Sequence, residues 1–133
     1  MHLIRRGDPN LAVRSSEGRT TVELYGELDL VLVQRVRPEL DVLTREAPAL
    51  TVDLRHLTFC DASGLGLLVR CAQRVRARGA AWHLICDQPT ILRLIRLTAL
   101  DDVLAPTPPP PPSPASCARP PGPRTGVPRR LRV

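Results

Sequence analysis

Residues 53–70 read DLRHLTFCDASGLGLLVR, and this stretch decides how the rest of the chain is interpreted. An apolar strand is predicted to end at Asp53, a short loop follows over residues 61–64, and an amphipathic helix opens with Leu65. Backbone amides at the start of a helix lack intrahelical partners. The loop serine, Ser63, and the nearby carboxylate are therefore placed either to cap the helix or to carry or hold an anion.

Segments on both sides of this unit show the patterns of strands. Two short, partly alternating runs at residues 11–16 and 20–25 flank Glu17-Gly18-Arg19 and predict a hairpin. Residues 49–54 and 81–86 are apolar runs that predict strands buried on both faces, and such burial implies parallel pairing.

Three further stretches carry apolar residues at helical spacing. Asp29 is placed to cap the first helix, which is predicted over residues 32–47. Pro38 removes a helical hydrogen bond, so we expect a kink or an irregular first turn; the alternative is a regular helix that starts at Pro38. The second helix ends near Gly79, and the third opens at Pro89.

The order of these segments predicts an α/β fold. A hairpin followed by alternating helices and strands gives a mixed sheet with helices on one or both faces. Residues 103–104 are expected to add a last short edge strand.

The C-terminal segment differs in composition from the rest. From Ala105 onward the chain holds most of the 15 prolines, five arginines and no acidic residue. We predict a disordered proline/arginine-rich tail over residues 106–133, because such a segment buries too little apolar surface to offset its ordering entropy. The first 104 residues hold 14 arginines and 13 acidic residues, so the net charge of +6 belongs mainly to the tail. Direct DNA binding by the folded part is not predicted.

Cysteines and hydropathy indicate the compartment. The four cysteines show no CxxC spacing, and three lie in apolar segments, which favours buried thiols in a reducing cytoplasm over a metal or disulfide site. They are Cys60, Cys71, Cys86 and Cys117. Residues 1–10 lack the apolar core of a signal peptide, and no run approaches transmembrane length. We expect a cytoplasmic protein that does not enter the membrane.

Ser63 lacks the surroundings of a catalytic serine. The sequence around it is not the GxSxG elbow, and His56 is the only candidate base, since His2 is terminal and His83 is expected in the core. Gly64-x-Gly66 lacks the third glycine of a dinucleotide fingerprint, and no phosphate-binding loop motif exists. We predict no enzyme activity, no cofactor and no metal; a small hydrolase that pairs Ser63 with His56 is the alternative.

Two non-catalytic roles fit Ser63. It can cap the helix, or it can accept a phosphate, which would add about −1.5 to −2 charges. The helix dipole tolerates that charge, so the fold would persist and a partner docked over the loop would feel the change. Asp29 and Asp61 would add negative potential if they lie nearby.

The side of the second helix opposite its apolar stripe is predicted to face outward. An exposed apolar residue beside Ser63, flanked by arginines, suits a partner-binding patch. The residues at this spacing are Leu67, Arg70, Cys71, Arg74 and Arg78.

Three motifs resemble those of the STAS domain family. Residues 26–29, GELD, resemble one family segment, and residues 51–54 with 61–66, TVDL and DASGLG, resemble its central signature. Residues 94–101, LIRLTALD, resemble the LxLTGLD near the end of the domain, with Ala99 in place of glycine. The resemblance implies a domain over residues 9–105, with a four- to five-stranded mixed sheet packed against three to four helices.

The resemblance also implies partner switching in bacterial transcription. Unphosphorylated anti-sigma factor antagonists of this family bind an anti-sigma factor with serine kinase activity, which phosphorylates a serine matching Ser63 and is thereby released; a serine phosphatase reverses the modification. Ala62 replaces a second possible acceptor. The expected partner-binding residues are Asp29, Asp61, Ser63, Gly64, Leu67, Arg70, Cys71 and Arg74. The alternative is a non-switching scaffold subunit of a signalling or transport-associated complex.

Overall fold

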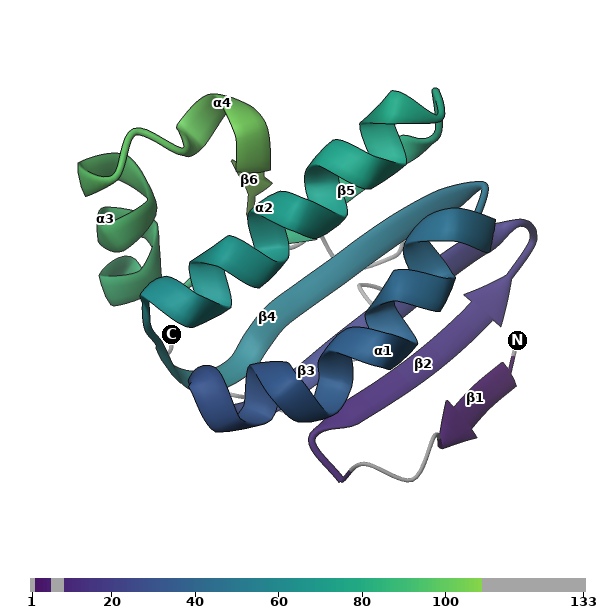
Figure 1. Ribbon diagram of the computed structural model, residues 1–133, viewed down its shortest axis with the longest axis horizontal. Helices are drawn as coiled ribbons and strands as arrows, with labels where there is room; N and C mark the ends of the chain where they lie inside the picture. The colour runs from purple at the N-terminus through teal and green to yellow at the C-terminus, as the bar shows by residue number, and fades with distance from the viewer. Residues whose placement is uncertain (1, 6–8, 109–133) are drawn as a thin grey trace, which may run out of the picture.

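The computed structural model describes the backbone of residues 2–5 and all of residues 9–108, which form one mixed sheet with four helices (Figure 1). The strands are His2–Arg5 (β1), Leu11–Ser16 (β2), Arg19–Leu28 (β3), Ala49–Cys60 (β4), Ala81–Ile85 (β5) and Pro106–Thr107 (β6). The helices are Leu30–Glu46 (α1), Ala62–Ala77 (α2), Pro89–Leu97 (α3) and Asp101–Leu104 (α4). The predicted α/β class is confirmed, and most of the predicted disordered tail lies outside the described residues.

The sheet order is the order of the sequence, β1-β2-β3-β4-β5-β6. β1, β2 and β3 pair antiparallel, which confirms the predicted hairpin, and β3 through β6 pair parallel. Two successive crossovers, through α1 and then α2, advance in one direction along the sheet. Since such crossovers are right-handed, both helices lie on the same face of the sheet, as Figure 1 shows.

The core lies between this face and the helices. Leu50, Val52 and Leu54 of β4 are fully buried beneath α1 and α2. The prediction that β4 and β5 are buried on both faces is wrong, because alternate residues of a strand point to opposite faces and polar side chains occupy the other face. His83 of β5 is accordingly exposed, and its predicted core position is wrong.

Several predicted boundaries move. β4 does not end at Asp53 but continues to Cys60, and α2 opens at Ala62, so only Asp61 separates strand from helix. β4 departs from regular pairing at shifts of register beside Glu23 and Gly26 of β3, and alternation alone does not predict such bulges. Residues 103–104 belong to the short helix α4 and not to a strand. The last edge strand is Pro106–Thr107, at the predicted start of the tail.

Helix α1 continues through Pro38, which lies in its interior. The ribbon of α1 bends near its middle in Figure 1, as expected where a proline removes a hydrogen bond. The alternative prediction, a regular helix that starts at Pro38, is wrong. Pro89 opens α3 as predicted. Ala99 keeps a left-handed backbone, with φ of 58°, where the resembling motif has glycine. None of the helices in the described ranges is long and apolar enough to cross a bilayer.

Candidate functional site

The candidate site lies where the parallel strands β3 and β4 end and the helices α1 and α2 begin. Parallel neighbours end at the same edge of a sheet, so the two helix starts lie next to each other. Each start is capped by an aspartate: Asp29 accepts a hydrogen bond from the Leu32 amide and Asp61 from the Gly64 amide, both at 3.0 Å. The predicted cap at Asp29 is confirmed. Two of the expected partner-binding residues, Asp29 and Asp61, are thereby brought to one edge.

The two helix starts are locked together through Gly64. The Asp61 amide donates to the Leu28 carbonyl at 3.2 Å. A β-carbon added to Gly64 would lie 2.6 Å from that same carbonyl oxygen and 2.8 Å from Cys60 Sγ. Gly64 is therefore required by close packing. It is buried, so the structure offers no Gly64 surface for the expected contact with a partner.

Ser63 lies in the first turn of α2 and is half-exposed. The interpretation of Ser63 as the helix cap is wrong, because Asp61 holds that position. No polar group among the described residues forms a hydrogen bond with Ser63 Oγ. Its hydroxyl has no structural task within the described part of the chain and faces a groove.

This groove, of about 410 Å³, runs between α1 and α2. Leu30 forms one side and is 55% exposed, although it is a large apolar side chain. Together the lining residues are Leu30, Val33, Arg37, Ser63, Gly66, Leu67 and Arg70.

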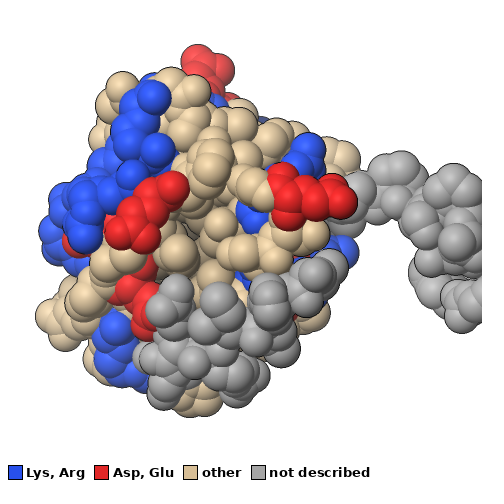
Figure 2. All heavy atoms as spheres, turned by 90° about the vertical axis from the view of Figure 1, so that its right-hand side faces the viewer, with Lys and Arg blue, Asp and Glu red and all other residues tan. Residues whose placement is uncertain are grey.

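A cluster of arginines surrounds one carboxylate beside the groove. Asp41 Oδ1 lies 3.1 Å from Arg70 Nε and 3.6 Å from Arg74 Nη1, and Asp41 Oδ2 lies 3.9 Å from Arg37 Nε. The hydrogen bond from Arg70 and the positive charges hold the pKa of Asp41 below its usual value. In the space-filling view, basic side chains form a band on the side of the molecule that carries the helices (Figure 2).

The predicted outward face of α2 needs correction. Leu67 is 3% exposed and Cys71 is 1% exposed, so neither offers a surface to a partner. The physical reason is that α2 packs against α1 as well as the sheet, and its buried stripe is wider than one face. Arg78 donates to the Thr44 and Ala47 carbonyls at the end of α1, so it joins the two helices.

Exposed apolar residues at this edge were not predicted from the sequence. Leu30 and Val31 begin α1 and are 55% and 62% exposed, and Phe59 near the end of β4 is 49% exposed. Residues 30–33 are four consecutive apolar residues at the start of a helix. Because one helical face cannot bury four consecutive side chains, that run was the available signal. We call Asp29, Leu30, Val31, Asp61 and Ser63 the strand-end surface.

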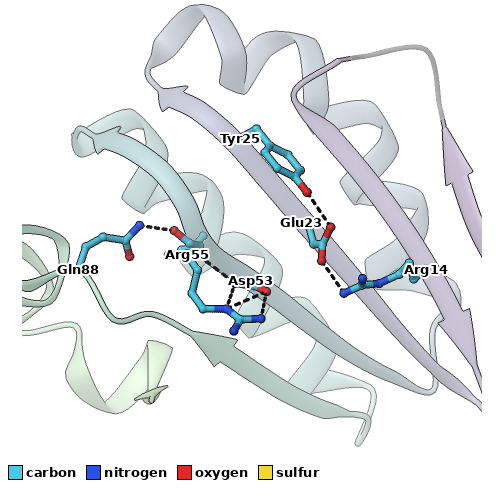
Figure 3. Close-up of polar contacts among 7 residues, drawn as sticks. Arg14, Glu23, Tyr25, Asp53, Arg55 and Gln88 are labelled. Carbon is cyan, nitrogen blue, oxygen red and sulfur yellow. Dashed lines mark hydrogen bonds and ion pairs between the residues drawn. The ribbon is translucent and has the colours of Figure 1, made fainter. Parts of the chain in front are cut away.

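The opposite face of the sheet carries a polar network (Figure 3). Glu23 contacts Arg14 at 2.5 Å and accepts a hydrogen bond from the Tyr25 hydroxyl at 2.9 Å. Asp53, on neighbouring β4, is paired with Arg55 at 2.7 Å. Burial alone would raise the pKa of Asp53, but hydrogen bonds from Arg55 outweigh it and hold the pKa below its usual value.

The same face holds the group in the described residues that most resembles a metal site. Potential ligand atoms of Glu23, Asp53 and His56 lie within 4.8 Å of one another. Both carboxylates are already neutralised by arginines, which disfavours a cation there. His56 stacks on Tyr25 with ring centroids 4.7 Å apart. It thus lies over the sheet face away from the helices and is not brought to Ser63, so the geometry does not assemble the hydrolase alternative.

The thiols are inert in this environment. Cys60, Cys71 and Cys86 are free and buried, as predicted. Burial raises the pKa of Cys60 and of Cys71 to about 12, which leaves almost no thiolate at neutral pH. Cys117 lies outside the described residues.

Comparison with known proteins gives a consistent set of relatives. Residues 10–111 match the family model described as the STAS domain. The anti-sigma-B factor antagonist of Bacillus subtilis is 26% identical over 95 residues, which cover 71% of this chain and 87% of that protein. The anti-sigma F factor antagonist of Paenibacillus polymyxa is 29% identical over 90 residues, covering 65% and 76%. The crystal structure of an anti-sigma factor antagonist from Mycobacterium paratuberculosis is similar with a TM-score of 0.67 and 25% identity, over 76% of this chain and 89% of that one.

Proposed function

Since the chain belongs to the STAS domain family, we propose that it is an anti-sigma factor antagonist that switches partners through phosphorylation of Ser63. Unphosphorylated, it binds an anti-sigma factor that is also a serine kinase, and so frees a sigma factor for transcription. The kinase transfers the γ-phosphoryl group of ATP to Ser63 Oγ, which gives up its proton, and ADP leaves. A serine phosphatase restores the hydroxyl. We place this cycle in the cytoplasm and the domain at residues 9–105.

The observation that carries the proposal is the free hydroxyl of Ser63. Asp61 caps α2, so the amides of its first turn do not depend on Ser63, and the hydroxyl is half-exposed at the rim of a groove. A serine with no structural task in the first turn of a helix can carry a phosphate without unfolding the domain, because the helix dipole favours negative charge there. Ser63 is best interpreted as the substrate of another protein's chemistry.

The surroundings of Ser63 suit a protein partner. Leu30 and Val31 expose apolar side chains at the start of α1, and Asp29 and Asp61 add acidic groups. Exposed apolar residues next to charged ones are typical of the centre and rim of an interface. Phosphate on Ser63 would bring about −1.5 to −2 charges into that surface. The complex is then weakened by bulk, by desolvation and by repulsion from acidic groups of the partner.

The test is a phosphorylation assay with the full chain, its cognate anti-sigma factor, ATP and Mg²⁺. Mass spectrometry maps the phosphate in wild type, Ser63→Ala and Ser16→Ala. Ser16, half-exposed at the end of β2, is the matched control. We expect the phosphate on Ser63, its loss in Ser63→Ala alone, and at least about tenfold weaker binding of Ser63→Asp, with an unchanged circular-dichroism spectrum. Binding with no phosphate on Ser63 would overturn the switch and leave the scaffold role.

A further inference from the structure

The arginines of the groove beside Ser63 carry more positive charge than Asp41, the acid they pair with, neutralises. Arg37 and Arg70 line the groove together with Ser63. Both guanidinium groups, and that of Arg74, are directed at the one carboxylate of Asp41. Three positive charges against one negative charge leave a surplus, and the side chains of Arg37 and Arg70 are 51% and 38% exposed. The groove is therefore complementary to a further anion.

Helix geometry places Arg70 on the same side of α2 as Ser63. Residues seven apart lie two turns apart on the same side of a helix, about 10 Å along its axis. The Arg70 guanidinium is held by Asp41 at 3.1 Å, and because long side chains on a helix readily lean back toward its N-terminus, it can swing from Asp41 toward Ser63. Arg37 approaches from α1 on the other side of the groove.

Gly66 leaves the space between them open. A β-carbon added to Gly66 would meet nothing within 4 Å, whereas one added to Gly64 would collide with the Leu28 carbonyl. Its φ does not lie in the positive range that favours glycine, and glycine weakens a helix interior. Neither packing nor backbone conformation explains Gly66. The glycine is explained by the open space that it leaves in the groove, where another group can approach the backbone of α2 closely.

We propose that this groove binds the phosphate of phosphorylated Ser63 within the same chain, with Arg70 and Arg37 as its ligands over the open floor at Gly66. The inference rests on the proposed phosphorylation of Ser63 and adds where the phosphate goes. A phosphate offers three acceptor oxygens and up to two charges, so it competes with Asp41 for the two guanidinium groups. Phosphorylation thus also rearranges the ion pairs between α1 and α2 and withdraws two arginines from the surface offered to a partner.

The test needs no kinase. Phosphoserine is incorporated at position 63 of the full chain during translation, and the phosphate is titrated by ³¹P NMR at physiological ionic strength. Its second pKa, about 6 in an exposed serine, should lie at least about 0.5 lower in the folded chain, because direct contact with two guanidinium groups favours the dianion by more than the carboxylates of Asp29 and Asp61 disfavour it. Arg70→Gln and Arg37→Gln should each return the midpoint toward the exposed value.

Arg74→Gln is the matched control. Arg74 pairs with Asp41 at 3.6 Å but does not line the groove, so its loss should leave the midpoint within about 0.1 at this ionic strength. The Nε–H signal of Arg70 should shift on phosphorylation, and circular dichroism checks that each variant is folded. A normal phosphate pKa in the wild type, or an equal effect of all three substitutions, would overturn the inference. A kinase that ignores Ser63 would overturn the proposed function and leave this titration unaffected.

Discussion

Gly64 and Gly66 lie two residues apart in α2, yet the same substitution should affect them in opposite directions. In Gly64→Ala the new methyl group would lie 2.6 Å from the Leu28 carbonyl oxygen and 2.8 Å from Cys60 Sγ. Ordinary non-bonded contacts between heavy atoms are about 3.5–4.0 Å, so backbone must move by more than half an ångström. Overpacking of this kind costs about 1–3 kcal/mol, and one of the atoms in the way belongs to the backbone, which favours the upper end.

The gain in helix propensity offsets part of that cost, by up to about 1 kcal/mol. We therefore expect Gly64→Ala to lower the free energy of unfolding by about 2 kcal/mol. Gly66→Ala meets nothing within 4 Å and should raise it by about 0.5–1 kcal/mol through propensity alone. For a domain of about 100 residues this separates the two melting temperatures by roughly 10–20 °C.

Urea unfolding followed by circular dichroism measures both changes, and a constant m-value shows that the unfolding transition itself is unaltered. If Gly64→Ala folds too poorly for measurement, the substitution is repeated in the stabilised Gly66→Ala background. Changes of equal sign and size at the two positions would refute the reasoning, because it assigns Gly64 to packing and Gly66 to an open surface.

Three further changes test the cap, the buried carboxylate and the surface. Asp61→Ala should cost about 1 kcal/mol in urea unfolding, and Asp61→Asn, which keeps an acceptor for the cap, should cost much less. Because Arg55 holds the pKa of Asp53 below its unfolded value, the pair stabilises the fold above about pH 4 and loses that contribution as the pH falls further. In Arg55→Gln the loss of stability between pH 5 and pH 3, followed by urea unfolding, should be smaller, and an unchanged pH profile would contradict the assignment. Leu30→Ser should weaken binding to the anti-sigma factor at least about tenfold in calorimetry with stability within about 0.5 kcal/mol of wild type. Leu97→Ser, at a more exposed leucine on α3, should leave binding unchanged.

Local patterns predicted the elements whose causes are local. The hairpin follows from two short runs around Gly18, which has a positive φ of 79°. The cap at Asp29 follows from one side chain and the amide three residues later. Pro89 at the start of α3 follows from a fixed φ and a missing donor. Each signal is complete within a few residues of sequence.

What the sequence could not predict depends on neighbours distant in the chain. Leu67 lies outside the stripe that faces the sheet, and it is buried only because α1 packs along that side of α2. Asp53 lies in an apolar run, and periodicity alone does not show that Arg55 neutralises it on a face without helices. The extension of β4 beyond Asp53 requires its pairing with the end of β3.

Residues 61–66 at the start of α2 fall into two pairs with different roles, one structural and one exposed to the groove. Asp61 and Gly64 are three residues apart, and both make structural contacts: Asp61 caps α2 and Gly64 packs against Leu28. Ser63 and Gly66 are also three residues apart, so they share a side, and that side faces the groove. Because the structural contacts belong to one pair and the accessible atoms to the other, a phosphate on Ser63 alters the surface without touching the contact that joins the two helix starts. A switch built this way should change affinity for a partner by a larger factor than it changes the stability of the domain. A modification that works by unfolding the domain would instead lower the stability of the domain at least as much as its affinity for the partner.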